Sequence, residues 1–128
     1  MKRFAFILIM MLATAVAYAK PPKLNIEQFF DGRYNKEQTV TTSIIKENGN
    51  YFRSMVIKNN PGIIKQLHNA LTKDKDRAEK FFEQTGEGGT SILVKIASNG
   101  EMIDIGFQQH PSGKNASLFI KGSEKAFK

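Results

Sequence analysis

Apolar and polar residues follow two different periods in the first part of the chain. Residues 26–30 carry apolar side chains at positions i, i+3 and i+4, which predicts a short helix with one apolar face, and Asn25 is predicted to cap it. Residues 39–47 and 51–58 are instead rich in β-branched side chains, as strands are. The Asn-Gly pair at 48–49 predicts that these two strands form an antiparallel hairpin.

Helical spacing returns after this hairpin. Asn60 followed by Pro61 is typical of a helix start, and apolar residues at intervals of three and four predict a helix over residues 61–72. Residues 74–84 keep a helix-like spacing of apolar and charged residues, so we predict a second helical segment there. Gly86 is predicted to end it.

The last part of the chain reads as three further strands. They are predicted at residues 90–97, 101–109 and 115–121, joined by a tight turn at 98–100 and a longer loop at 110–114. Apolar and polar residues alternate along the middle strand, which predicts one buried face and one face in contact with water.

These elements predict an α+β fold in the order α-β-β-α(α)-β-β-β. About five strands form a mostly antiparallel sheet, and the helical segments cover one of its faces. The pattern does not determine the order of strands in the sheet, or whether the first hairpin joins the same sheet as the last three strands.

The first nineteen residues read as a secretory signal peptide. Two basic residues precede an uninterrupted apolar run at 4–12, and the segment ends in Ala17-Tyr18-Ala19, a pattern that signal peptidase accepts. Cleavage is predicted between Ala19 and Lys20. The alternative, a retained membrane anchor, would have an apolar stretch of sixteen residues at 4–19, whereas a spanning helix needs about 20.

Removal of the signal peptide from the 128-residue chain leaves 109 residues, the length of one domain. Residues 20–24 read as a flexible, proline-containing leader, and residues 25–128 as a single α+β domain. The chain has no cysteine, so we expect neither a disulfide nor a lipid attached to the mature N-terminus, and hence no permanent membrane anchor. The expected location is the periplasm or the extracellular space.

No motif in the sequence fixes a chemistry. His68 and His110 lack the spacing of a metal site, so no metal and no cofactor are expected. Asp74 and Asp76 alternate with basic residues, which favours a solvated helix face over a pair of catalytic carboxylates. A small envelope hydrolase with a dispersed site stays an alternative, and these four residues would be its first candidates.

The leading hypothesis is a non-enzymatic binding or interaction module of the cell envelope. The polar face of the last three strands is the expected partner surface, with Lys95, Asp104, Gln108 and Lys121 on it. The partner, an envelope protein or a ligand, is not identified by the sequence, and neither is the oligomeric state. Export and a net charge that falls from +7 to +5 on loss of Lys2 and Arg3 argue against nucleic acid as the partner.

Several segments resemble a family of known sequences. They are Tyr51 to Pro61 (YFRSMVIKNNP), Asp76-Arg77-Ala78, Ile105-Gly106-Phe107 and Ala126-Phe127. With these segments the chain resembles a group of short exported proteins of Gram-negative bacteria that are classed as a domain of unknown function. The resemblance extends over most of residues 24–128 and implies a periplasmic or secreted setting. It transfers no catalytic residue.

Overall fold

The computed structural model describes residues 24–127. The predicted signal peptide and its cleavage site between Ala19 and Lys20 lie outside the described residues, as do residues 20–23 of the predicted leader. Leu24, which the sequence analysis assigned to that leader, is buried in the core, so the folded domain includes it. Within residues 24–127, no helix combines the length and the apolar composition that crossing a membrane requires.

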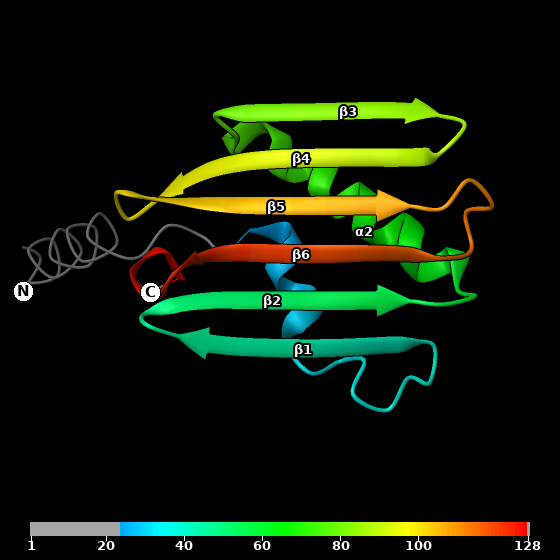
Figure 1. The fold of residues 1–128 in the computed structure, drawn as a ribbon, viewed down its shortest axis with the longest axis horizontal. Helices are drawn as coiled ribbons and strands as arrows, with labels where there is room; N and C mark the ends of the chain where they lie inside the picture. Colours follow the sequence, from blue (N-terminus) through cyan, green and yellow to red (C-terminus); the bar gives the residue numbers. More distant parts are fainter. Residues whose placement is uncertain (1–23, 128) are drawn as a thin grey trace, which may run out of the picture.

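A single antiparallel sheet of six strands forms one layer of the domain (Figure 1). The strands are β1 (Val40–Glu47), β2 (Asn50–Ile57), β3 (Lys80–Gly86), β4 (Gly89–Ser98), β5 (Glu101–Gln109) and β6 (Ala116–Ser123). Their order across the sheet is β1-β2-β6-β5-β4-β3. The predicted α+β class is confirmed, and the first hairpin joins the same sheet because β2 pairs with β6.

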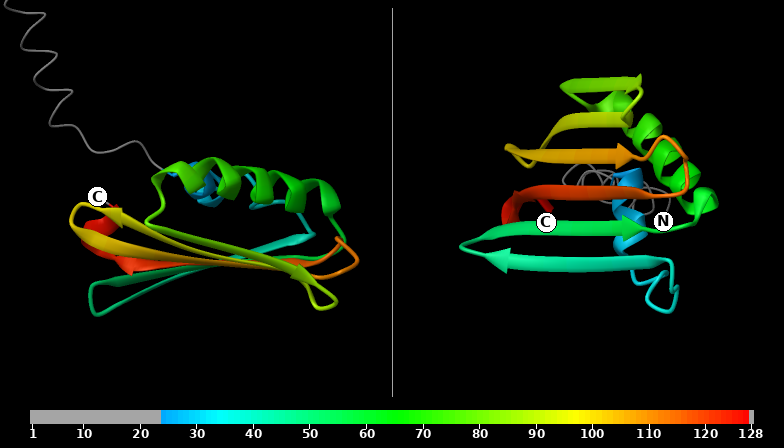
Figure 2. Two further views of the ribbon diagram at one scale, coloured as in Figure 1. Left: turned by 90° about the horizontal axis from the view of Figure 1, so that it is seen from above. Right: turned by 45° about the vertical axis from the view of Figure 1, so that its right-hand side comes forward.

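The second layer lies on one face of the sheet only. It contains the helix α2 (Pro61–Asp74) and the 3-10 helix η1 (Asn25–Phe30), and Figure 2 shows both on the same side of the strands. Two shorter 3-10 helices, η2 (Lys75–Arg77) and η3 (Glu124–Phe127), follow α2 and β6. The other face of the sheet is covered by no described element, and we call it the open face.

Two turns with positive backbone angles set the register of the sheet. Asn48 and Gly49 between β1 and β2 have φ values of 52° and 79°, and Asn99 and Gly100 between β4 and β5 have 54° and 78°. Positive φ at both central residues is the type I′ geometry, whose twist matches that of the flanking strands. Both hairpins predicted from the sequence are therefore confirmed.

The prediction of a second helical segment at residues 74–84 is wrong. After α2 and η2 the chain becomes extended at Ala78, and β3 then pairs with β4 at the edge of the sheet. Phe81 lies half-buried toward the helices and Phe82 on the open face, because successive strand side chains point to opposite faces. Gly86 accordingly ends a strand, and the sheet has six strands instead of about five.

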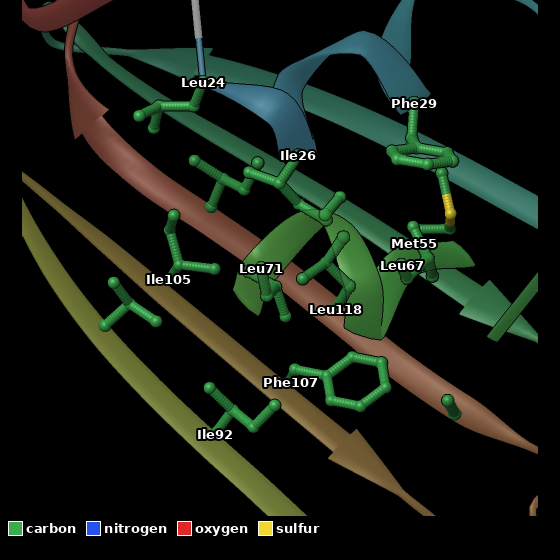
Figure 3. Packing of buried hydrophobic residues seen from close by; sticks show 14 of the residues in the cluster. Leu24, Ile26, Phe29, Met55, Leu67, Leu71, Ile92, Ile105, Phe107 and Leu118 are labelled. Carbon is green, nitrogen blue, oxygen red and sulfur yellow. The ribbon is translucent and has the colours of Figure 1, made fainter. Parts of the chain in front are cut away.

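The hydrophobic core lies between the helices and the covered face of the sheet (Figure 3). One face of α2 contributes Ile63, Ile64, Leu67, Ala70 and Leu71, as its predicted amphipathic spacing requires. Leu67 and Leu71 are fully buried, and burial of a leucine side chain contributes about 1.5–3 kcal/mol. Figure 3 shows them facing Ile105, Phe107 and Leu118 of the two central strands.

A buried carboxylate fastens η1 to the end of α2. Asp74 is inaccessible to solvent, and its Oδ1 accepts hydrogen bonds from the backbone N–H of Asn25 at 2.7 Å and from Asn25 Nδ2 at 2.9 Å. Its Oδ2 accepts from the backbone N–H of Ile26 at 2.9 Å. The expectation that Asn25 caps the first helix is thus wrong: the residue at the cap position is Leu24, and the Asn25 side chain donates to Asp74.

Candidate functional site

The open face carries large apolar side chains in contact with solvent. Met55 and Ile57 of β2 are fully buried on the covered face, so their neighbours Phe52 and Val56 point to the open face and are 38% and 40% exposed. The same alternation brings further apolar side chains to this face. They are Ile45, Phe82, Leu93, Met102 and Phe119.

Strand pairing arranges part of the open face in two parallel rows. The first, the apolar row, crosses β6, β5, β4 and β3 in register and consists of Phe119, Gly106, Leu93 and Phe82. The second, the charged row, lies two residues further along the same strands and consists of Lys121, Asp104, Lys95 and Lys80. On each of these four strands, one residue of the apolar row therefore lies next to one residue of the charged row.

A hollow of about 500 Å³ opens between the two rows. Its lining comprises the large side chains of the apolar row, all four residues of the charged row, and Val94 and Ile105. Small-molecule sites in proteins have volumes of about 300–1,000 Å³ and combine apolar walls with a few polar groups. The hollow falls within this range of size and composition.

An aromatic stack forms the wall of the hollow at β6. The rings of Phe119 and Phe52 are stacked, with centroids 5.9 Å apart and an angle of 7° between their planes. Phe119 also lies directly over Gly106, where a Cβ atom would collide with the ring. Glycine at position 106 is thus what allows the ring to lie flat on β5.

The charged row has more positive than negative groups. Lys95 Nζ lies 3.7 Å from Asp104 Oδ1, and both side chains are about half exposed. Asp104 Oδ1 is shielded from solvent and accepts no hydrogen bond. Its contact with Lys95 is therefore an ion pair that includes no hydrogen bond. Within residues 24–127, neither Lys80 nor Lys121 forms an ion pair. Because exposed ion pairs are weak, at about 0–1 kcal/mol, the ammonium groups stay free to meet another anion.

Three of the four residues predicted for the partner surface line this hollow, namely Lys95, Asp104 and Lys121. Gln108 lies on the same face but outside the hollow. Its Oε1 accepts a hydrogen bond from Ser91 Oγ, and its Nε2 donates to the carbonyl oxygen of Gly88 at 3.2 Å. Its amide thus supports the turn between β3 and β4.

Comparison with known proteins assigns the chain to a family. The model of a family described as "Family of unknown function (DUF6108)" matches residues 12–121, from before the first described residue to within β6. The chain belongs to the DUF6108 family. No curated protein and no solved structure matches it. The resemblance to a domain-of-unknown-function family is confirmed, whereas the exported bacterial setting that it implies stays a prediction.

The hydrolase candidates of this DUF6108 protein lie in different surroundings. His68 on α2 contacts Glu83 of β3, with 2.9 Å between Nε2 and Oε2. His110 contacts Ser112 in its own loop, with 2.9 Å between Nδ1 and Oγ. Nδ1 also accepts from the Ser112 backbone N–H at 3.1 Å, and Ser112 Oγ accepts from the N–H of Lys114 at 3.2 Å, so these contacts close the loop. In the described part of the chain, no hydrogen bond joins the two pairs.

The two aspartates proposed with them are separated by their environment. Asp74 is buried and uses both oxygens to hold η1, so it cannot serve as a solvent-accessible catalytic group. Asp76 is exposed in η2. Among residues 24–127, no three His, Asp or Glu side chains gather in a way that could hold a metal ion.

The sequence analysis missed the other half of the hollow. Lys80 and Phe82 were assigned to a helical segment, whereas they lie on an edge strand in which every residue except the half-buried Phe81 is exposed. Phe52 and Phe119 are aromatic residues on strands, which are usually part of the core. Only the register between β2 and β6 reveals that they stack on the open face. Gly106 is the one signal in the sequence for this part of the hollow, because a glycine inside a strand often marks a place where another group lies close against the backbone.

Proposed function

We propose that this DUF6108 protein is an exported, non-enzymatic binding module of the bacterial cell envelope, and that its partner docks on the open face of the sheet. The observation that supports this most is the hollow between the apolar row and the charged row. It joins exposed aromatic and aliphatic side chains to the ammonium groups of Lys80 and Lys121, which form no ion pair among residues 24–127, and this is the composition of a binding site rather than of a solvated surface.

The cost of exposing these side chains supports the proposal. Phe82 and Leu93 are both 56% exposed, and they are paired across β3 and β4 instead of scattered. Apolar surface removed from water contributes about 25 cal/mol per Å². A partner that covers this pair would gain this free energy, and the fold itself does not recover it.

A retention experiment tests the proposal. The purified protein is immobilised and incubated with envelope extract, and retained proteins and small molecules are identified by mass spectrometry. Leu93→Glu places a carboxylate in the apolar row and should abolish retention. Asn69→Glu is the matched control, because it adds the same charge at an exposed position of α2, on the opposite side of the molecule. It should retain what the unchanged protein retains.

The outcome is read only from variants that keep their fold. Far-UV circular dichroism should show the same spectrum for all three proteins, because Leu93 is exposed and not part of the core. If the folded protein retains nothing that is specific, or if Leu93→Glu and Asn69→Glu behave alike, the open face is not the binding surface and the proposal fails.

Export is tested separately on the sequence that predicts it. Expression of the full chain in a Gram-negative host should yield a product in the periplasm or medium whose N-terminal residue is Lys20. A product that keeps Met1 and stays with the cytoplasmic or membrane fraction would contradict the proposed location while leaving the binding surface open to test.

A further inference from the structure

We propose that the hollow binds a single-chain anionic amphiphile, with its anionic head between Lys80 and Lys95 and its apolar chain over Leu93 and Phe82 toward Phe119. This inference rests on the proposed function and names the class of ligand that the site takes. The head group carries its charge on a carboxylate or on a phosphate, and the shared requirement is one anion joined to one apolar chain.

The position of the head follows from a like-charge pair. Lys80 of β3 and Lys95 of β4 are direct cross-strand partners. Adjacent strands lie about 4.8 Å apart, and like charges directly opposite one another destabilise a sheet. Asp104 relieves this repulsion from one side only, since it contacts Lys95 at 3.7 Å and Lys80 forms no ion pair in the described residues. An anion between the two ammonium groups would relieve it.

The position of the chain follows from the neighbouring pair on the same strands. Leu93 and Phe82 are cross-strand partners two residues along from Lys95 and Lys80, which is about 7 Å along a strand. The apolar row continues over Gly106 to the ring of Phe119. An acyl chain whose head lies at the lysine pair can therefore run across β4 and β5 without leaving apolar surface.

Size and charge exclude simpler occupants. A hollow of about 500 Å³ is much larger than an inorganic anion needs, and an inorganic anion would leave the apolar row in water. A second copy of the same face would bring the same excess of lysine against itself. A neutral lipid would bury the apolar row but leave the lysine pair unrelieved. An anionic amphiphile satisfies both rows at once.

Binding is measured by isothermal titration calorimetry, with two-dimensional NMR to locate the ligand. The probes are dodecanoate, monododecyl phosphate, neutral dodecanoylglycerol and acetate, each below its micelle-forming concentration. Dodecanoate or the phosphate should bind and shift the amide signals of β3 and β4 most. The neutral ester should bind about tenfold more weakly, and acetate should not compete. Comparison of the two anionic probes distinguishes a carboxylate head from a phosphate head.

Two sets of variants test the two parts of the ligand. The double variant Lys80→Gln/Lys95→Gln should weaken binding of the anionic probes by about three- to tenfold and leave the neutral ester unaffected. Leu93→Ser should weaken all three dodecyl probes by about fivefold. Lys65→Gln/Lys73→Gln, which removes two exposed lysines from α2, is the matched control and should change nothing.

A measurement without ligand adds an independent check. Because Lys80 and Lys95 repel one another, Lys80→Gln should leave the thermal midpoint of the free protein unchanged or raise it, and added dodecanoate should stabilise the unchanged protein more than this variant. A lower midpoint for Lys80→Gln would show that the lysine has a structural partner and would overturn the head-group assignment.

Failure of the inference is distinguishable from failure of the proposed function. If the neutral ester binds as tightly as dodecanoate, or if the lysine variants have no effect, the ligand is not selected by charge and the inference is overturned. If neither anionic probe binds, yet Leu93→Glu still abolishes retention from envelope extract, the open face binds a different partner. The inference then fails and the proposed function stands.

Discussion

Replacement of Asp74 by alanine is expected to destabilise the protein severely, although the residue lies far along the chain from the segment it holds. Asp74 closes α2, and its carboxylate accepts two backbone N–H groups and one side-chain amide from the start of η1. Through these bonds a single side chain links segments 48 and 49 residues apart in sequence. Loss of the carboxylate should release η1 and expose the core beneath it.

The magnitude follows from the burial of the group. Hydrogen bonds to a charged acceptor contribute about 1.5–3 kcal/mol each, and a buried donor left without a partner costs about 1–3 kcal/mol. Asp74 is fully buried, so Asp74→Ala leaves the N–H groups of Asn25 and Ile26 without an acceptor. We expect a loss of about 3–5 kcal/mol, a large part of the 5–15 kcal/mol typical of a domain.

Asp74→Asn separates the loss of the acceptor from the loss of volume. Asparagine has the same shape but keeps one acceptor oxygen, and its NH₂ group would face a donor, so the expected loss is about 2–3 kcal/mol. Asp76→Asn is the matched control. Asp76 is exposed in η2 and has no hydrogen-bond or ion-pair partner among residues 24–127, so its change should stay within about 0.5 kcal/mol.

Urea unfolding followed by far-UV circular dichroism gives the free energies, and amide hydrogen exchange locates the effect. The N–H of Ile26 should lose its protection in both Asp74 variants and keep it in Asp76→Asn. Equal unfolding free energies for Asp74→Asn and Asp76→Asn, or an Ile26 amide that stays protected, would refute the role given to the buried carboxylate.

One helix-cap residue and three glycines give further predictions. Asn60→Ala should lower the free energy of unfolding by about 1 kcal/mol, because Asn60 Oδ1 accepts the N–H of the third residue of α2 at 3.1 Å, and urea unfolding measures it. Gly89→Ala should cost at least about 2 kcal/mol, since φ is 102° and a Cβ would collide with the carbonyl oxygen of the last residue of β5. Gly88→Ala has open space and should cost clearly less in the same assay. Gly106→Ala should be costly only while Phe119 keeps its ring, so a double-mutant cycle with Phe119→Ala should show a coupling of about 0.5–1 kcal/mol; additive effects would contradict the close approach.

The parts of the fold that sequence reasoning predicted depend on local chemistry. Asn48-Gly49 and Asn99-Gly100 adopt positive φ at both central residues, which few other residue pairs tolerate, and each fixes a hairpin by itself. The start of α2 is similarly local, since Asn60 caps the helix and Pro61 begins it. Such signals need no information about distant parts of the chain.

The error at residues 74–84 has a non-local cause. Phe81 and Phe82 follow Ala78 at helical spacing, but two adjacent apolar residues also fit a short strand, so the pattern alone does not decide between helix and strand. The segment becomes a strand because the free edge of β4 provides backbone N–H and C=O groups with which it pairs. The sequence of the segment does not show that this edge is available, because β4 lies later in the chain.

Only part of the candidate site was predicted from the sequence, again because the rest depends on contacts between strands that are distant in the chain. Alternation along β5 was enough to turn Asp104 to the open face, and the same rule applied to Lys95 and Lys121. It could not show that these three residues share one row, because a row depends on the register between strands. Nor could it add Lys80 to the row, since that residue was assigned to a helix.

Stability and the proposed binding role are separable in this fold because the two faces of the sheet alternate within each strand. On β4, Ile92, Val94 and Ile96 are buried on the covered face, whereas Leu93 and Lys95 between them face the hollow. A change at an open-face position therefore alters the hollow and leaves the core intact, as surface substitutions usually change stability by less than about 0.5 kcal/mol. Gly106 is the exception, because the ring of Phe119 lies over it and a larger residue there would disturb both the strand and the hollow. The same strands can thus keep their core when the rows of the open face are changed.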